Sequence, residues 1–115
     1  NHAAFWNGRD LRLTPAYGIA PRLRGAAEAN QALLITDSHR ESRLVHALEA
    51  APAFRIASEQ EARQMIDDQI GVIRTNWSSV CDDAGMTQVE REFFMGRQIL
   101  NPYAFEGYGD YPGFL

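Results

Sequence analysis

The sequence predicts a mainly α fold with a small N-terminal β-hairpin, an α+β arrangement in one segment, 1–115. Three observations lead to this prediction. An Asn-Gly dipeptide at 7–8 lies between two short runs of alternating apolar and polar residues, which is typical of a hairpin turn. Apolar residues recur at helical spacing over 62–80. Sequences typical of a capping box begin at Ser58 and at Thr87 and indicate two helix starts.

The hairpin is the first expected element, and it should pair residues 2–6 with residues 10–14. Both residues of the turn tolerate positive φ, so the strands can reverse tightly. Pro15 lacks an amide hydrogen and should end the ladder, after which the chain becomes a loop. Before the first helix we expect a surface loop over 21–30, a short buried strand over 32–35 and a turn at 37–38.

Helices are expected over most of the remaining chain. The first, over 41–50, would place Leu44, Val45 and Leu48 on one face and would end before Pro52. The last would open at Thr87 and run to about Leu100.

Between them, a long helix is expected from Ser58 as N-cap, with Glu61 reaching back to the cap, to Gly85 as C-cap. Arg63, Asp67, Asp68 and Arg74 should face solvent. Its apolar stripe would consist of Ala62, Ile66, Ile70, Ile73, Trp77 and Val80.

Composition excludes several classes of function. All 11 basic residues are arginine, so this chain holds no P-loop lysine, Schiff-base lysine or ATP-gripping kinase lysine. A net charge of −4 argues against direct binding of nucleic acid.

No apolar run approaches the roughly 18 residues of a membrane span, and we expect a cytoplasmic protein. Because Asn1 opens the chain and the first methionine is Met65, we expect part of a longer protein.

The three histidines, His2, His39 and His46, follow no recognised metal-binding spacing. His39 and His46 are seven residues apart and would share a helical face if the first helix began early. Scattered surface histidines and glutamates are common, so we favour a solvated surface over a metal site here. The acidic neighbours that could complete a metal site are Asp37, Glu41 and Glu49.

Two other groups of residues have ordinary structural explanations. Cys81 has no histidine arranged to activate it, and a single cysteine forms no internal disulfide, so we expect a packed thiol. The pairs at 67–68 and 82–83 are adjacent on a helix, so their carboxylates point about 100° apart and belong to a solvated face.

The aromatic tail over 101–115 has two open interpretations, packing against the helices or contact with a partner. Its candidate partner-surface residues are Tyr103, Phe105 and Tyr108, and Tyr111 and Phe114 complete the set.

The front of the chain suggests a functional arrangement. A hairpin returns the chain to its starting level, so Asn1 and the loop that follows residue 14 should lie close together. Protein kinases place their two metal ligands, an asparagine and an aspartate, in this way around a hairpin.

The motifs at 1–5 (NHAAF) and 11–17 (LRLTPAY) resemble those of the HipA-like kinase family, the toxin component of bacterial type II toxin–antitoxin pairs. In that family the catalytic loop ends in Asp-x-His-x-x-Asn, and the next hairpin leads to Leu-x-Pro-x-Tyr-Asp. The stretches 77–85 (WSSVCDDAG) and 96–106 (GRQILNPYAFE) resemble one subgroup of the family. The resemblance therefore extends over essentially all of the chain.

This resemblance implies that Asn1 matches the Mg²⁺-binding asparagine, while Gly18 stands where the family has its second metal ligand, an aspartate. Glycine has no carboxylate, so the ion would lose a charged ligand and activity should be weak or lost. Asp10 could substitute only if it lay near Asn1, and its position beside the hairpin turn argues against that. The catalytic aspartate is expected five residues before Asn1, outside this chain, together with the ATP-phosphate loop.

Two interpretations of function follow. In the first, the chain is the C-terminal part of a HipA-like serine/threonine kinase, divided into a hairpin and metal-loop region at 1–36, a helical subdomain at 41–100 and the aromatic tail. ATP, Mg²⁺, a small DNA-binding antitoxin and a protein substrate such as an aminoacyl-tRNA synthetase are then implied for the parent protein. These 115 residues alone would not be active. In the second, the chain is a non-catalytic helical binding module or a truncated remnant.

Overall fold

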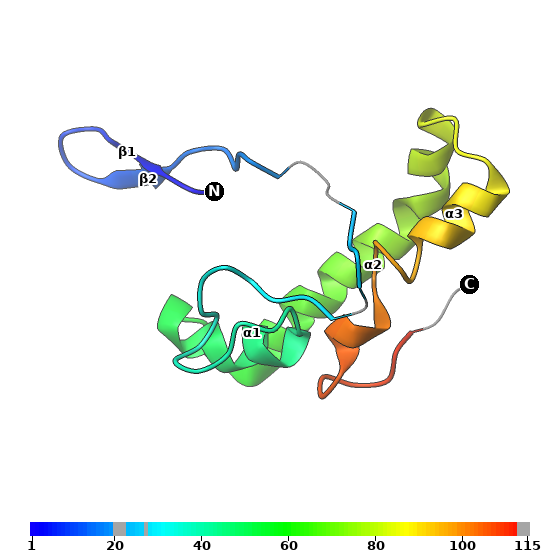
Figure 1. Cartoon of the computed structure of the whole chain (residues 1–115). Helices are drawn as coiled ribbons and strands as arrows, with labels where there is room; N and C mark the ends of the chain where they lie inside the picture. The colour runs from blue at the N-terminus through cyan, green and yellow to red at the C-terminus, as the bar shows by residue number, and fades with distance from the viewer. Residues whose placement is uncertain (20–22, 27, 113–115) are drawn as a thin grey trace.

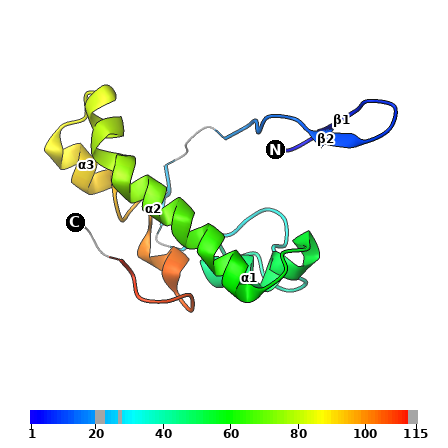
Figure 2. The same ribbon diagram turned by 180° about the vertical axis from the view of Figure 1, so that it is seen from behind.

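The structure is a computed structural model that describes residues 1–19, 23–26 and 28–112. It is mainly helical, with one two-stranded antiparallel hairpin at the N-terminus, as the sequence predicted. Figures 1 and 2 show the hairpin standing apart from the helical part in both views. The long helix α2 is the axis around which the other helical elements are arranged (Figure 1).

The hairpin pairs β1 (Ala4–Trp6) with β2 (Leu11–Leu13), and Phe5 lies opposite Arg12 in the register. The turn is closed by the Asn7 side chain, whose Oδ1 accepts hydrogen bonds from the amides of Arg9 and Asp10. The predicted hairpin is therefore confirmed, with shorter strands than expected. Both faces of the ladder are exposed, and Leu13 is 77% exposed.

The predicted strand over 32–35 does not form. The pairing lies instead at the two ends of this segment, where Asn30 and Glu41 form an isolated antiparallel bridge. Gln31 N donates to Arg40 O at 2.6 Å, and Ser42 N donates to Ala29 O at 2.8 Å. Residues 32–35 occupy the loop between these ends, and Leu33 is 82% exposed.

Helix α1 (Leu44–Ala50) begins three residues later than predicted and continues into a 3₁₀ turn, η1 (Ala51–Phe54). Pro52 does not stop the chain from being helical, because the first turn of a helix does not need the amide hydrogen that proline lacks. The turn ends at Arg55, which adopts a left-handed conformation with φ of 60°.

Helix α2 (Glu59–Asp83) confirms the predicted long helix. Ser58 Oγ accepts a hydrogen bond from Glu61 N at 3.1 Å, while the Glu61 carboxylate accepts from Ala57 N. Leu48, Ala51 and Ala62 form the small core between α1 and α2. The apolar stripe is covered only in part, and Val80 is 53% exposed.

The C-terminal elements differ from the prediction in one respect. The capping box at Thr87 is present, but α3 (Gln88–Phe94) ends well before Leu100. Met95 is extended and Gly96 has a φ of 78°, so the chain leaves the helix there and turns back toward Ile99. A 3₁₀ turn, η2 (Pro102–Phe105), follows and lies against α1.

Candidate functional sites

The hairpin brings Asn1 and Gly18 into direct contact. Thr14 N donates to Ala3 O at 2.9 Å, which extends the pairing beyond the strands toward the chain start. The Tyr17 hydroxyl donates to His2 O at 3.2 Å, and Asn1 Nδ2 donates to Gly18 O at 3.1 Å. The geometric part of the prediction, that a hairpin places these two positions side by side, is confirmed.

Gly18 has no room for a side chain in this arrangement. Its φ is +64°, and a Cβ built on it would lie 2.8 Å from Asn1 Oδ1. Any larger residue here would therefore displace the Asn1 carboxamide as well as adopt a conformation that L-residues rarely occupy.

Asn1 and Gly18 do not by themselves form a Mg²⁺ site. Mg²⁺ favours carboxylate oxygens in near-octahedral geometry, and this pair offers only one side-chain oxygen, Asn1 Oδ1. Asp10 does not supply the missing carboxylate, because it lies at the hairpin turn, at the opposite end of the ladder from Asn1.

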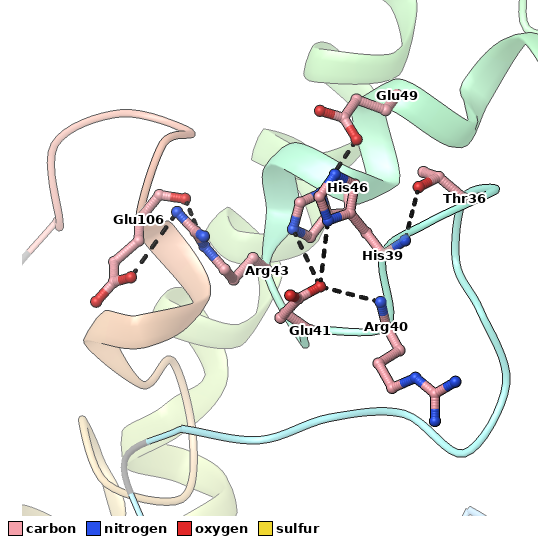
Figure 3. Close-up of polar contacts among 8 residues, drawn as sticks. All are labelled: Thr36, His39, Arg40, Glu41, Arg43, His46, Glu49 and Glu106. Atoms are coloured by element: carbon pink, nitrogen blue, oxygen red, sulfur yellow. Dashed lines mark hydrogen bonds and ion pairs between the residues drawn. The ribbon is translucent and has the colours of Figure 1, made fainter.

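A second constellation forms where the 29–42 loop meets α1, and we call it the His–Glu cluster: His39, Glu41 and His46 (Figure 3). One ligand atom from each of these side chains lies within 4.8 Å of the other two. Glu41 Oε2 is 3.4 Å from His39 Nδ1 and 3.7 Å from His46 Nε2. The two imidazole rings are stacked, with centroids 4.1 Å apart.

Local backbone contacts position each member of the His–Glu cluster. The His39 carbonyl accepts from Ile35 N at 2.7 Å, and its amide donates to Thr36 Oγ1 at 3.2 Å, which closes the turn predicted at 37–38. Glu41 lies in the bridge with Asn30, and His46 lies in the first turn of α1. The cluster thus combines a loop and a helix, not the single helical face that the spacing suggested.

The electrostatics of the cluster centre on Glu41. Its pKa is lowered, first by a hydrogen bond from its own backbone amide and then by the Arg40 amide and the two nearby imidazoles. Burial opposes this effect only in part. Glu41 is therefore a carboxylate near neutral pH, directed at two imidazole nitrogens.

Of the other acidic residues considered for this site, Glu49 contributes from outside the cluster. Its Oε2 lies 3.1 Å from His46 Nδ1, on the far side of the ring from Glu41 (Figure 3). Asp37 is exposed and does not belong to the group. His2 lies on the hairpin and takes no part.

The aromatic tail packs against the helical part of the same chain. Phe105 is 4% exposed and contacts the Tyr111 ring edge-on, with centroids 5.4 Å apart. Tyr108 packs against the core, and Tyr103 is half-buried with the Arg43 guanidinium 5.9 Å from its ring centroid. Packing therefore explains Phe105, while Phe114 lies outside the described residues.

The tail also changes the environment of α2. Arg63 and Arg74 are half-buried and not on an open solvent face as predicted. Arg63 donates to Tyr108 O at 3.0 Å, and the Tyr108 hydroxyl donates to Asp67 Oδ1 at 2.6 Å. Cys81 is completely buried, as expected of a packed thiol.

One concave feature was not predicted from the sequence. A groove of about 700 Å³ is lined on one side by Arg24 and on the other by residues that follow α3, including Arg97. Gln98 joins the two sides, since its side chain bonds both the amide and the carbonyl of Arg24. Contacts between residues 74 positions apart leave no local sequence signal.

Searches found no match for this chain among protein-family models, curated proteins or solved structures. Among the described residues, no helix is both long enough and apolar enough to cross a membrane.

Proposed function

We propose that this chain is the C-terminal portion of a HipA-like serine/threonine protein kinase in which phosphoryl transfer is weak or lost. The motifs at 1–5 and 11–17 support the proposal, together with one structural observation that carries it. The hairpin holds Asn1 against Gly18, the two positions that correspond to metal ligands in the resembled family.

In such a kinase the γ-phosphate of ATP passes to a protein hydroxyl, and catalysis depends on positioning and electrostatics. Bound Mg²⁺ would neutralise charge on the phosphates. Within this chain, Asn1 Oδ1 would face the nucleotide, and the proton of the accepting hydroxyl would go to an aspartate upstream of Asn1. Because Gly18 supplies no carboxylate, the chain lacks one group that stabilises the transferring phosphoryl.

The same proposal covers partners and location. A small DNA-binding antitoxin and a protein substrate are expected for the parent protein in the cytoplasm. The net charge of −4 is consistent with DNA contact made only through the antitoxin.

A non-catalytic partner-binding module is the second candidate, and the exposed hairpin favours it. Phe5, Trp6, Leu11 and Leu13 are each at least 64% exposed among the described residues. An apolar two-stranded ladder is only marginally stable in water, so another polypeptide surface should cover it. In the kinase this surface would be the upstream part of the same chain, whereas in a binding module it would be a partner.

Substitution of Gly18 in the full-length parent tests the kinase proposal. Asn1 is exposed, and the end of its side chain must turn to admit any residue at position 18. With that rearrangement we expect Gly18→Asp to raise autophosphorylation at least about tenfold, because it restores the missing carboxylate, and tenfold corresponds to about 1.4 kcal/mol of transition-state stabilisation. Transfer of radiolabelled phosphate from ATP measures the change.

Gly18→Asn is the matched control, because asparagine has the same shape and tolerates positive φ but carries no charge. An equal response of both variants would contradict a missing-carboxylate explanation. Absence of Mg·ATP binding by the parent and by Gly18→Asp would reject the kinase proposal and favour the binding module.

A further inference from the structure

We propose that His39, Glu41 and His46 bind one divalent transition-metal ion, with Zn²⁺ as the preferred ion. Two imidazoles and one carboxylate are a common protein donor set for zinc. Ligand atoms arranged tetrahedrally about Zn²⁺ lie roughly 3.3 Å from one another, given bonds of about 2.0–2.1 Å. The distances of 3.4 Å and 3.7 Å from Glu41 Oε2 to the two imidazole nitrogens are close to that separation.

The unpaired nitrogen of His46 is an independent observation that points to a ligand. The His46 side chain is only 6% exposed, and within the described part of the chain its Nε2 is buried without a hydrogen-bond partner. Buried polar atoms in native proteins nearly always have a hydrogen-bond partner, so one without a partner at a cluster of ligand atoms points to cation binding. This nitrogen is directed at Glu41.

Glu49 selects the form of His46 that can coordinate a metal. A carboxylate accepts a hydrogen bond, so the contact of Glu49 Oε2 with Nδ1 at 3.1 Å keeps the proton on Nδ1. Nε2 of the neutral ring then carries a lone pair that faces the Glu41 carboxylate, and two acceptors repel each other. A cation between them removes this repulsion, and a carboxylate behind a metal-binding histidine is the usual outer-sphere partner.

The position of the cluster indicates what the ion would do. Leu33 and Leu34 are exposed, so the 29–42 loop has little apolar anchorage of its own. Two ligands lie at the end of this loop, and the third lies on α1. A bound ion would therefore fasten the loop to the helix. His39 is 42% exposed and can rotate out of its stack with His46 to direct Nδ1 at the ion.

This proposal does not depend on the kinase assignment, because the His–Glu cluster uses none of the residues near Asn1. The competing explanation is that a proton on His46 Nε2 faces Glu41 while the proton on Nδ1 faces Glu49, and this arrangement predicts no metal binding.

The proposal is tested by titrating the EDTA-treated 115-residue chain with ZnCl₂ and measuring the heat of binding by isothermal titration calorimetry. We expect one Zn²⁺ per chain with a Kd at or below about 1 μM. His39→Ala and Glu41→Gln should each weaken binding at least tenfold. Both side chains are part-exposed, so neither change should prevent folding. His2→Ala is the matched control, since His2 is an exposed histidine outside the cluster, and it should leave binding unchanged.

Co²⁺ gives a second readout. Binding at the cluster should produce visible d–d absorption without a thiolate-to-cobalt band, because Cys81 is buried elsewhere. Hydrogen exchange of amides 29–42 should slow at least threefold when Zn²⁺ is added. The proposal is overturned if no Zn²⁺ binds at about 100 μM, or if His39→Ala and Glu41→Gln bind as tightly as the unaltered chain.

Discussion

Tyr108 shows how one side chain from the tail joins distant parts of the molecule. Its hydroxyl donates to Asp67 Oδ1 at 2.6 Å and lies 3.3 Å from Arg63 O, while the Arg63 guanidinium lies 4.7 Å from the centre of its ring. Burial, followed by the hydrogen bond and the charge of Asp67, raises the pKa of Tyr108 to about 12. The neutral phenol is therefore the form that stabilises this contact.

Tyr108→Phe removes the hydroxyl that donates to Asp67 and keeps the aromatic ring. We expect the substitution to lower the free energy of unfolding by about 1 kcal/mol near neutral pH, the usual contribution of one hydrogen bond. Urea denaturation measures the change. An unaltered midpoint would show that the Tyr108 hydroxyl does not stabilise the fold.

The pH dependence of that difference has a definite sign. The pKa in the folded state is raised above the ordinary value of 10, so the stabilisation is complete below pH 10. It should decrease as the pH rises through about 12, where the folded-state phenol ionises beside the Asp67 carboxylate. Ultraviolet titration should show a late phenolate step in the unaltered chain that is missing in Tyr108→Phe.

At the scale of the elements, α2 is defined by signals at both of its ends. Gly85 adopts a φ of +64° just after the helix, its amide bonds Asp82 O, and the amide of Met86 bonds Cys81 O. This pair of bonds is the Schellman arrangement, which satisfies the last carbonyls of a helix. Arg91 strengthens the junction with α3 through an ion pair with Asp82 at 2.6 Å.

Replacing either of two glycines in this region by alanine should change the stability of the chain, but in opposite directions. Gly85→Ala should destabilise the chain by about 1 kcal/mol, because alanine is strained at positive φ although no atom obstructs its Cβ. Gly71→Ala should stabilise it by about 0.5–1 kcal/mol, because Gly71 lies inside α2 with open space around it. Thermal unfolding monitored by circular dichroism compares the two.

Equal effects of the two alanines would contradict this account, since the same side chain is added in each case. Only the backbone conformation differs between the two positions.

At the scale of the whole molecule, the chain is extended. Its radius of gyration is 16.3 Å, whereas a compact domain of this length has about 13 Å. Figures 1 and 2 show why, because the hairpin projects away from the helices. Its apolar side chains therefore gain little from burial, and the strands are held by the backbone ladder and by a few exposed side-chain hydrogen bonds.

Hydrogen exchange should reveal this division. We expect amides of β1 and β2 to exchange at least a hundredfold faster than amides in the middle of α2, because an isolated hairpin opens readily. Mass spectrometry of peptic fragments measures both regions in one experiment. In the full-length parent the hairpin should become protected if an upstream segment covers it. If the amides of the hairpin and of α2 exchanged at equal rates in the 115-residue chain, the hairpin would be shown to dock on the helical part.

Features that depend on neighbours within a few residues were predictable from the sequence. The hairpin turn at Asn7, the helix starts at Ser58 and Thr87, and the stop at Gly85 were all predictable, because each is formed by local hydrogen bonds or by backbone preference. Contact between Asn1 and Gly18 was also predictable, since a hairpin of known register returns the chain to its start.

Packing between elements set the remaining features. The spacing of His39 and His46 suggested one helical face with three candidate acidic neighbours, whereas the closed 29–42 loop brought the two histidines together and selected Glu41 from the three. The tail covered Arg63, which the helical pattern had assigned to solvent. Both arrangements depend on how whole elements pack, the 29–42 loop against α1 and the tail against α2, and no local spacing records that packing.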